Sequence, residues 1–292
     1  MSDATPLIIT GSNGQLGRSL RDVSMPGHYQ PHYFTRSELD ITDADAIEEA
    51  IVRTGCRYFI NCAAYTKVDL AETEQESATA VNVGAVAAMA QASARHDVTL
   101  IHISTDYVYD QDLGRPFRED DPVNPQSVYA RTKLAGEQAA LQHQPRTVIL
   151  RTSWVFSDYG HNFVKTMLRL AADGRSLKVV ADQVGCPTYA RDLAQAILRV
   201  MQTLETGRDD VFGVYNFSNA EPTNWHDFAA EIFRQAGMNA DLSPTTSDAY
   251  VTPARRPAYS VMDTSRFRRT FGMTPRSWQE ALAECLPQVI PA

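Results

Sequence analysis

A glycine-rich turn near the amino terminus constrains the fold of this chain more than any other feature. The apolar run at residues 7–10 is typical of a buried strand and leads into TGSNGQLG, where Gly11, Gly14 and Gly17 recur every third residue. Such glycines permit a tight turn, a close approach of backbone to pyrophosphate, and tight helix–strand packing. The helix that follows offers free N–H groups to phosphates. The segment therefore predicts a dinucleotide site, or the same strand–turn–helix unit without a ligand.

Short apolar runs alternate with helical patterns over the first half of the chain. This alternation predicts an α/β fold with a Rossmann-like, doubly wound parallel sheet. The expected strands are 7–10, 33–35, 58–62, 98–103 and 147–150, and the expected helices after the glycine turn are 43–53, 71–95 and 127–142.

The second half is more mixed and predicts a smaller α/β substrate-binding domain. We expect residues 1–155 to form the dinucleotide-binding domain, with 189–217 returning to it, and 156–188 and 218–292 to form the substrate domain. Prolines between 244 and 257 favour a long loop. The expected helices here are 163–172, 191–204, 224–236 and 277–286, and the expected strands are 177–180 and 211–217.

Charge and composition narrow the class of partner. The net charge of -8 argues against nucleic acid and against an anionic membrane surface. No apolar run is long enough to cross a bilayer, and the first residues lack the pattern of a secretory signal. The four cysteines have neither metal-ligand spacing nor a disulfide framework, which favours reduced thiols. We therefore expect a cytoplasmic protein that binds small molecules.

The end of the second expected strand bears on the choice of cofactor. NAD sites usually place an acidic residue there, whereas NADP sites often place an arginine. The strand ends at Arg36, whose planar guanidinium suits a 2′-phosphate, although a solvated surface arginine is the alternative. We expect NADPH, with NADH also usable. Asp40 lies beneath the adenine in this interpretation, or else caps the helix that begins near residue 43.

A tyrosine and a lysine in the segment YARTK are the candidate catalytic pair. The chain has only four lysines, and Lys133 alone has a tyrosine, Tyr129, four residues before it. On a helix the two side chains share one face. A nearby ammonium favours a phenolate, so we expect Lys133 to lower the pKa of Tyr129. The alternative is an ordinary pair on an exposed helix.

A hydroxyl group supplies the third candidate element. Thr105 follows the strand at 98–103, at the sheet edge where parallel sheets bind ligands. Its hydroxyl can hydrogen-bond a carbonyl and stabilise a developing alkoxide, or it can serve only in a turn. Glycine turn, strand-end hydroxyl and YxxxK occur in the order and spacing of a short-chain dehydrogenase/reductase.

The resemblance extends almost from end to end. The chain resembles the dTDP-4-dehydrorhamnose reductase family, a group of extended short-chain reductases that act on nucleotide sugars. Nine segments carry the resemblance: GQLG, ELDITD, NCAAYTKVDLAE, STDYVYD, VYARTKLAGE, RTSWVFS, NFVKTMLRLA, DQVGCPT and TPARRPAYS.

The resemblance implies a particular reaction. A hydride passes from the nicotinamide to the 4-keto carbon of dTDP-4-dehydro-6-deoxy-L-mannose, and the product is dTDP-L-rhamnose. Tyr129 gives a proton to the new oxygen, Lys133 orients cofactor and tyrosine, and Thr105 tunes the carbonyl.

The resemblance also implies further site residues. Trp154 has a second interpretation as a core aromatic, Asn162 as a helix cap, and Arg255 as a neighbour of Arg256 without contact. Arg256 is the candidate for the substrate pyrophosphate because bidentate arginine suits phosphate oxygens. The implied cofactor residues, beyond those above, are Gln15, Leu16, Ile41, Ala63, Ala64, Tyr65 and Thr66, and the implied substrate residues are Thr105, Asp106, Trp154, Asn162 and Arg256.

Two of the positions at which the chain departs from the resemblance concern a metal site, and a third is Tyr259, where relatives often have asparagine near the substrate phosphates. At the first two, some relatives carry glutamates that help hold a magnesium-bridged dimer, whereas this chain has Ser19 and Arg191. A serine and an arginine cannot form that carboxylate site. We therefore expect no metal and no structural magnesium, and either a monomer or a dimer that magnesium does not bridge.

Three rival functions remain open. Sugar-nucleotide dehydratases place an Asp-Glu pair after the strand-end threonine, but here Asp106 is followed by Tyr107. A reductase for a different nucleotide 4-keto-6-deoxysugar would show the same residues. A non-catalytic NADP-binding regulatory subunit of the same fold is the third rival, and the presence of Thr105, Tyr129 and Lys133 favours an enzyme over it.

Overall fold

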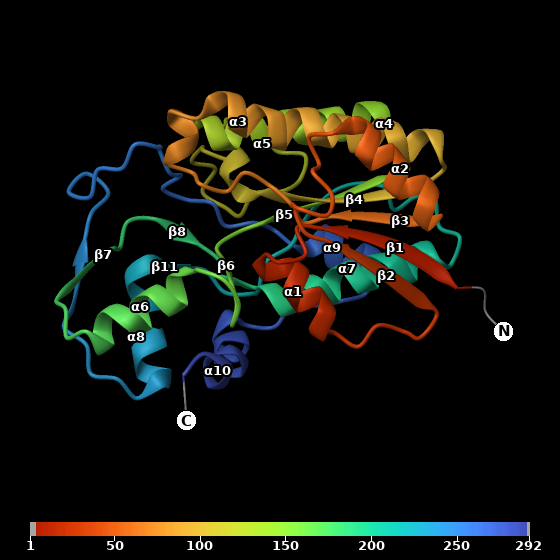
Figure 1. The fold of residues 1–292 in the computed structure, drawn as a ribbon. Helices are drawn as coiled ribbons and strands as arrows, with labels where there is room; N and C mark the ends of the chain where they lie inside the picture. Colours follow the sequence, from red (N-terminus) through yellow and green to blue (C-terminus); the bar gives the residue numbers. More distant parts are fainter. Residues whose placement is uncertain (1–3, 291–292) are drawn as a thin grey trace.

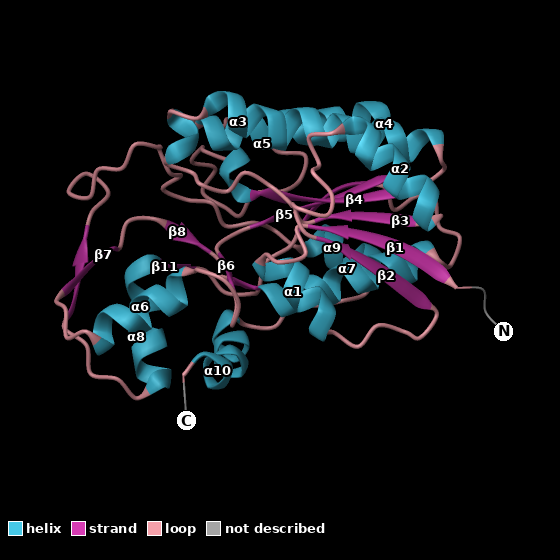
Figure 2. Cartoon of the chain, viewed as in Figure 1, coloured by secondary structure: helices cyan, strands magenta, loops and turns pink. Residues whose placement is uncertain are grey.

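A six-stranded parallel sheet forms the centre of the molecule (Figures 1 and 2). The computed structural model describes residues 4–290. Because β1 has β2 on one side and β3 on the other, the chain reverses its direction of winding there, and a crevice opens at the carboxyl ends of these strands. The predicted doubly wound sheet is confirmed. In spatial order the strands are β2 (Tyr29–Phe34), β1 (Thr5–Thr10), β3 (Tyr58–Asn61), β4 (Thr99–Thr105), β5 (Thr147–Thr152) and β10 (Gly213–Asn216).

Helices cover both faces of the sheet (Figure 1). On one face lie α2 (Ala44–Thr54), α4 (Ala85–Arg95) and α5 (Val128–His143). On the other lie α1 (Gln15–Asp22), α7 (Ala190–Leu204) and α9 (Ser265–Phe271). The four inner strands β1, β3, β4 and β5 are buried on both sides, which explains their nearly continuous apolar runs.

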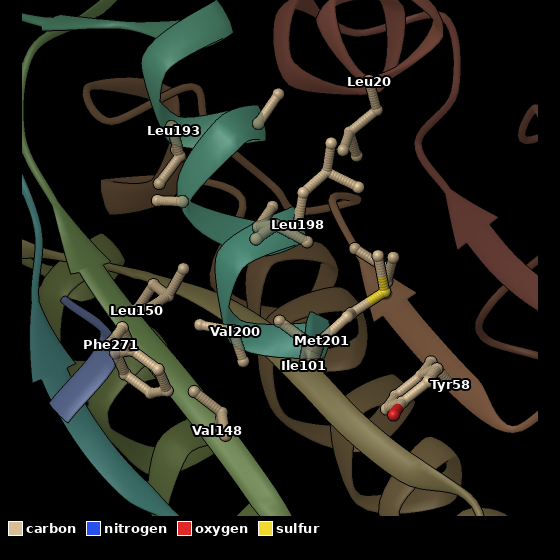
Figure 3. Close-up of a cluster of buried hydrophobic side chains, with 14 of the residues drawn as sticks. Leu20, Tyr58, Ile101, Val148, Leu150, Leu193, Leu198, Val200, Met201 and Phe271 are labelled. Carbon is tan, nitrogen blue, oxygen red and sulfur yellow. The ribbon is translucent and has the colours of Figure 1, made fainter. Parts of the chain in front are cut away.

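The cluster beneath α7 shows how this face is held (Figure 3). Leu193 and Met201 of α7 pack against the strand residues Ile101, Val148 and Leu150, and all five side chains are fully buried. Each such side chain contributes about 1.5–3 kcal/mol through removal of its apolar surface from water. The sheet is therefore a rigid platform for the groups at its carboxyl edge.

The single helix expected at 71–95 is interrupted, so that prediction is wrong in detail. A short 3-10 turn, Leu70–Glu72, precedes α3 (Gln75–Thr79), and a π-helical segment, Ala80–Gly84, joins α3 to α4. Tertiary contacts explain the interruption. The Glu72 carboxylate accepts a hydrogen bond from Val128 N at the start of α5, and Asn82 in the π segment binds the backbone of Tyr65 on both sides. Such π segments often occur at functional sites.

A second hydrophobic cluster lies beyond the carboxyl edge of the sheet. It is built from α6 (Phe163–Ala172), α8 (Trp225–Ala236), α10 (Trp278–Val289) and β7 (Leu177–Val180). All the helices and strands expected in the second half are found, with α7 and β10 in the layer of the central sheet. A strand replaces the start of the proline-rich loop expected at 244–257. Three short strand pairings and α9 were not expected. The pairings are β7 with β12 (Leu242–Thr245), β6 (Val155–Phe156) with β9 (Thr188–Tyr189), and β8 (Val184–Gly185) with β11 (Thr223–Asn224).

The length and apolarity of the helices bear on membrane insertion. Within residues 4–290, no helix combines the two to the degree that crossing a bilayer would require.

Candidate active site

A cavity of about 1170 Å³ runs along the carboxyl ends of the central strands and reaches the second cluster. It brings together segments that lie far apart in the sequence: the glycine turn, the end of β4, the first turns of α5, and the loop after β5. Three residues predicted from the sequence, Gly17, Asn162 and Arg256, do not line it. The predicted residues that do are Gly11, Gly14, Gln15, Leu16, Arg36, Asp40, Ile41, Ala63, Ala64, Tyr65, Thr66, Thr105, Asp106, Tyr129, Lys133 and Trp154.

The glycine turn is shaped by backbone contacts that exclude side chains. Gly11 has φ +65°, and a Cβ there would lie 2.7 Å from Ala63 N. A Cβ on Gly17 would lie 2.4 Å from Gly11 O, so this glycine allows α1 to pack onto the turn. Gly14 precedes α1, and no side chain caps the helix. The free N–H groups face the cavity and fit a pyrophosphate.

The adjoining end of the cavity carries the groups expected at the adenosine ribose. Within the described part of the chain Arg36 forms no salt bridge, so its guanidinium is available to a phosphate. The α2 helix is capped by Asp43, whose carboxylate accepts hydrogen bonds from Asp45 N and Ala46 N. Asp40 instead accepts from Thr42, so its alternative interpretation as the cap of α2 is wrong.

Thr105, Asp106 and Tyr129 line the cavity together where β4 ends. The Thr105 hydroxyl donates to Asp106 Oδ1 at 3.2 Å. Asp106 is buried, and its carboxylate accepts from Ser260 Oγ at 2.6 Å. Burial raises the pKa of Asp106 to about 7, although hydrogen bonds from Ser260 and Thr105 act in the opposite direction.

The Tyr129 hydroxyl is not activated in the way the sequence suggested. Burial, aided by the charge of Asp106, raises the pKa of Tyr129 to about 12. The expectation that Lys133 lowers this pKa is wrong for this structure, because the lysine is engaged elsewhere. Its Nζ donates to Ile103 O at 2.6 Å and lies 3.3 Å from His102 Nε2. Burial also lowers the pKa of Lys133, to about 8.

Two stacked tryptophans line the far end of the cavity. The rings of Trp154 and Trp225 are 3.6 Å apart between centroids and nearly parallel, with an interplanar angle of 12°. Trp154 has φ +47°, and Gly185 lies so close that a Cβ would come within 2.8 Å of the indole. Trp225 was not expected in the site, since it lies 71 residues from Trp154 in the numbering and nothing in its local pattern marks it.

Asn162 and Arg256 are committed to protein contacts. Asn162 caps α6 by accepting from Lys165 N, as its alternative interpretation expected, and donates to the Gln15 side chain at 3.0 Å. Arg256 binds both carboxylate oxygens of Asp69, at 3.0 and 2.8 Å. The neighbouring Arg255 pairs with a different carboxylate, that of Asp110. Contacts of Asn162 and Arg256 with substrate remain predictions.

Ser19 is buried in α1, and Arg191 takes part in ion pairs. The Ser19 hydroxyl donates to Gln15 O, and Arg191 lies between Asp22, at 3.8 Å, and Glu284, at 3.2 Å. Across residues 4–290 there is no group of three or more His, Cys, Asp or Glu side chains able to hold a metal ion.

Fold and site together define a short-chain dehydrogenase/reductase: a doubly wound sheet, a glycine cradle, and a Tyr–Lys pair beside a strand-end threonine. Comparison with known proteins narrows the class. The sequence model of a family described as "RmlD substrate binding domain" matches residues 5–290. The chain belongs to this family, whose members include dTDP-4-dehydrorhamnose reductases.

Individual relatives are similar to this chain over nearly their whole length. A dTDP-4-dehydrorhamnose reductase of Aggregatibacter actinomycetemcomitans is 42% identical, with 94% of this chain and 96% of the relative covered. A "Probable dTDP-4,6-dihydroxy-2-methyloxan-3-one 4-ketoreductase" of Streptomyces antibioticus is 40% identical, with 98% and 96% covered. The crystal structure of a Bacillus anthracis dTDP-4-dehydrorhamnose reductase in complex with NADP is 35% identical, superposes with a TM-score of 0.92, and covers 98% of this chain and 99% of its own.

Proposed function

We propose that this protein uses NADPH to reduce the 4-keto group of dTDP-4-dehydro-6-deoxy-L-mannose, which yields dTDP-L-rhamnose. The observation that carries the proposal is the convergence of Thr105, Tyr129 and Lys133 on one cavity that begins at the glycine cradle. The cavity is large enough for a dinucleotide and a second ligand. The names of the relatives supply the substrate.

The residues of the cradle fit a bound dinucleotide. Gly11 and Gly14 would admit the pyrophosphate against the backbone, and Arg36 would pair with the 2′-phosphate. A bound NADPH supplies the hydride. NADH is also usable in this proposal, since the 2′-phosphate contact adds affinity without touching the reacting atoms.

The side chains at the end of β4 are suited to proton donation. With a pKa raised to about 12, Tyr129 stays protonated at neutral pH and has a proton to give to an alkoxide. Thr105 lines the same cavity as Tyr129, where its hydroxyl would bind the substrate oxygen. Lys133 lines the same cavity, where its Nζ would hold the nicotinamide ribose.

A second candidate is reduction of a different dTDP-4-keto-6-deoxysugar. The Streptomyces relative, named as a 4-ketoreductase of another dTDP-sugar, is nearly as similar as the relatives named for rhamnose. Tyr107 beside Asp106 leaves no glutamate for a dehydratase. A purely regulatory NADP-binding module would have no need for a threonine, a tyrosine and a lysine that line one cavity.

The test is turnover of the purified protein with NADPH and the 4-keto sugar nucleotide, followed by identification of the sugar. We expect NADPH oxidation and an L-rhamnosyl product. An epimeric or differently deoxygenated sugar product would instead support the second candidate, reduction of a different dTDP-4-keto-6-deoxysugar. Tight NADPH binding without oxidation would contradict the enzyme proposal and support a binding module.

Two structural expectations belong to the same proposal. We propose that residues 1–155 with 189–217 bind the dinucleotide, and that 156–188 and 218–292 bind the sugar nucleotide. The second hydrophobic cluster, to which α6, α8 and α10 contribute, supports this division, whereas α9 packs on the central sheet. We also propose a monomer, or a dimer without magnesium; light scattering should give one mass with and without a chelator, and a chelator-sensitive dimer would contradict this.

A further inference from the structure

A chain of buried hydrogen bonds leads from the first strand to Lys133. Thr10 Oγ1 donates to Asn61 Oδ1 at 2.8 Å, Asn61 Nδ2 lies 3.1 Å from His102 Nδ1, and His102 Nε2 lies 3.3 Å from Lys133 Nζ. All four residues are at most 2% exposed. Three adjacent strands and α5 thus contribute one side chain each. Because these groups are shielded from bulk water, the direction of each hydrogen bond is fixed by its partners.

The Asn61 amide can be oriented in only one way. Its Oδ1 accepts from Ala63 N at 3.0 Å, and a backbone N–H is always a donor. A flipped amide would face two donors toward each other at this contact. Asn61 Nδ2 is therefore the atom that faces His102, and it donates.

The orientation of Asn61 decides the tautomer of His102. Burial and the nearby Lys133 hold the pKa of His102 well below its usual range, so the imidazole is neutral. Its Nδ1 accepts from Asn61, so its single proton lies on Nε2. That N–H points at Lys133 Nζ. An ammonium has no lone pair to accept it, whereas a neutral amine has one.

We infer that His102 is a positioning residue that donates a hydrogen bond to Lys133 and so favours the neutral amine over the ammonium. The neutral amine can accept from His102 while donating to Ile103 O. When Lys133 is protonated, the His102 N–H meets another donor and this hydrogen bond is lost. The hydrogen bonds from Thr10 through Asn61 to His102 therefore disfavour protonation of Lys133.

Another charged group acts in the opposite direction. Glu137, one turn further along α5, raises the pKa of Lys133, but its carboxylate is already paired with Arg151 at 2.6 Å. Burial dominates and sets the value at about 8. The titratable groups in the surroundings of Lys133 are Tyr129 and Glu137 on α5, His102 on β4, Arg151 on β5, Cys62 after β3, and Asp106 and Tyr107 in the 3-10 turn Asp106–Val108.

The consequence for catalysis rests on the proposed function. A lysine balanced between its two forms near neutral pH can release a proton after the tyrosine has given its own, and can regain it. A lysine held firmly as an ammonium would release it more slowly. His102 and Asn61 would therefore matter for the pH range of turnover rather than for binding of substrate.

The decisive variant is Asn61→Asp. It reverses the direction of the hydrogen bond between residue 61 and His102, and the new side chain has nearly the same shape. A carboxylate would still accept from Ala63 N, but would also accept from His102 Nδ1–H, so the lone pair of Nε2 would face Lys133. The ammonium would then gain a hydrogen bond, and we expect the titration midpoint of Lys133 to rise by about one pH unit or more.

Titration by NMR of protein carrying ¹³Cε-labelled lysine measures this midpoint directly. The chain has four lysines, so four signals suffice, and the other three serve as internal references because none bonds His102 or Asn61 within the described residues. The measurement uses the protein without cofactor. It therefore decides the inference even when the proposed reaction does not occur.

The effect of the new negative charge on the titration midpoint of Lys133 must be distinguished from the effect of the reversed His102 tautomer. We compare Asn61→Asp in the wild-type background with the same change in a His102→Phe background. If His102 transmits the effect, most of the rise disappears in the second background. An equal rise in both would overturn the inference, because the charge would then act through space.

A second readout does not depend on Asn61→Asp. The ¹⁵N shifts of His102, identified by the loss of one of seven histidine signals in His102→Phe, should show a protonated Nε2 and an unprotonated Nδ1. The opposite tautomer in the wild-type protein would overturn the inference. This result stands even if Asn61→Asp fails to fold.

Discussion

The two ends of the active-site cavity are built in different ways. At the cofactor end the surface is mainly backbone: Gly11 and Gly17 leave no room for a Cβ, and uncapped N–H groups face the cavity. At the substrate end the surface is made of side chains held by partners from distant parts of the chain, as in the Trp154–Trp225 stack and the hydrogen bond that Asp106 accepts from Ser260. The shape of the cofactor end is therefore set by rigid backbone and does not depend on side-chain pairs. The shape of the substrate end depends on contacts between side chains that are distant in the sequence.

This difference predicts that the two ends will respond to different kinds of substitution. Adding atoms should be most damaging at the cofactor end, because backbone cannot yield. Removing side chains should be most informative at the substrate end, because each removal frees a partner.

Gly11→Ala should have the largest effect. The new Cβ would lie 2.7 Å from Ala63 N, and φ +65° is strained for alanine. We expect a loss of about 4 kcal/mol in the free energy of unfolding and a rise of at least about 100-fold in the Kd for NADPH. Denaturant unfolding and fluorescence titration measure both. Gly27→Ala, which has nothing within 4 Å of its Cβ, is the control, and equal effects of both variants would break the contrast.

Asp106→Asn should reveal the burial of charge at the substrate end. The pKa of Asp106 is raised to about 7, so the folded protein holds this proton more tightly than the unfolded chain, and stability falls as pH rises from about 4 to 7. Asparagine does not titrate, so the variant does not lose this stability as pH rises. We expect the variant to gain about 2–3 kcal/mol relative to wild type on going from pH 5 to pH 8, measured by urea unfolding.

Asp40→Asn at the cofactor end is the matched control. Hydrogen bonds from Thr42 lower the pKa of Asp40, so this carboxyl is ionised in folded and unfolded protein throughout pH 5–8. The stability difference from wild type should stay constant over that range. A pH-dependent difference of the same size as for Asp106→Asn would contradict the proposed distinction between the two ends.

Arg256→Ala should have the smallest effect on stability. Its pair with Asp69 is partly exposed, and we expect a loss below about 1 kcal/mol. If Arg256 exchanges Asp69 for the substrate pyrophosphate, the KM for the sugar nucleotide should rise about tenfold, since a charge-assisted hydrogen bond is lost. Steady-state kinetics with Arg255→Ala as the matched variant measures this. Equal KM values in the two variants would remove Arg256 from the substrate site.

The features predictable from sequence were those fixed by near neighbours in the chain. Strand and helix order, the glycine turn and the Tyr129–Lys133 spacing each depend on residues a few positions apart, and the parallel sheet is confirmed. Thr105 was also identified, because the end of a buried strand is visible in the sequence.

The features that were missed depend on contacts between distant residues. Trp225 reaches the cavity only because α8 packs beside the loop after β5, and Asp69 meets Arg256 across 187 positions. The direction of the Tyr129 pKa was mistaken because burial, which no local pattern reveals, outweighs the neighbouring lysine. The hydrogen bond of Lys133 to His102 similarly requires β4 and α5 to be packed together.

The central claim is that Tyr129 donates the proton in a reductase, and Tyr129→Phe with NADPH and the 4-keto sugar nucleotide tests it most directly. We predict that kcat falls by about 10²–10⁴-fold while the Kd for NADPH is unchanged, because only the hydroxyl is removed. Tyr215→Phe, whose hydroxyl binds Val211 O away from the cavity, should turn over like wild type. A Tyr129→Phe enzyme with wild-type kcat would contradict the account.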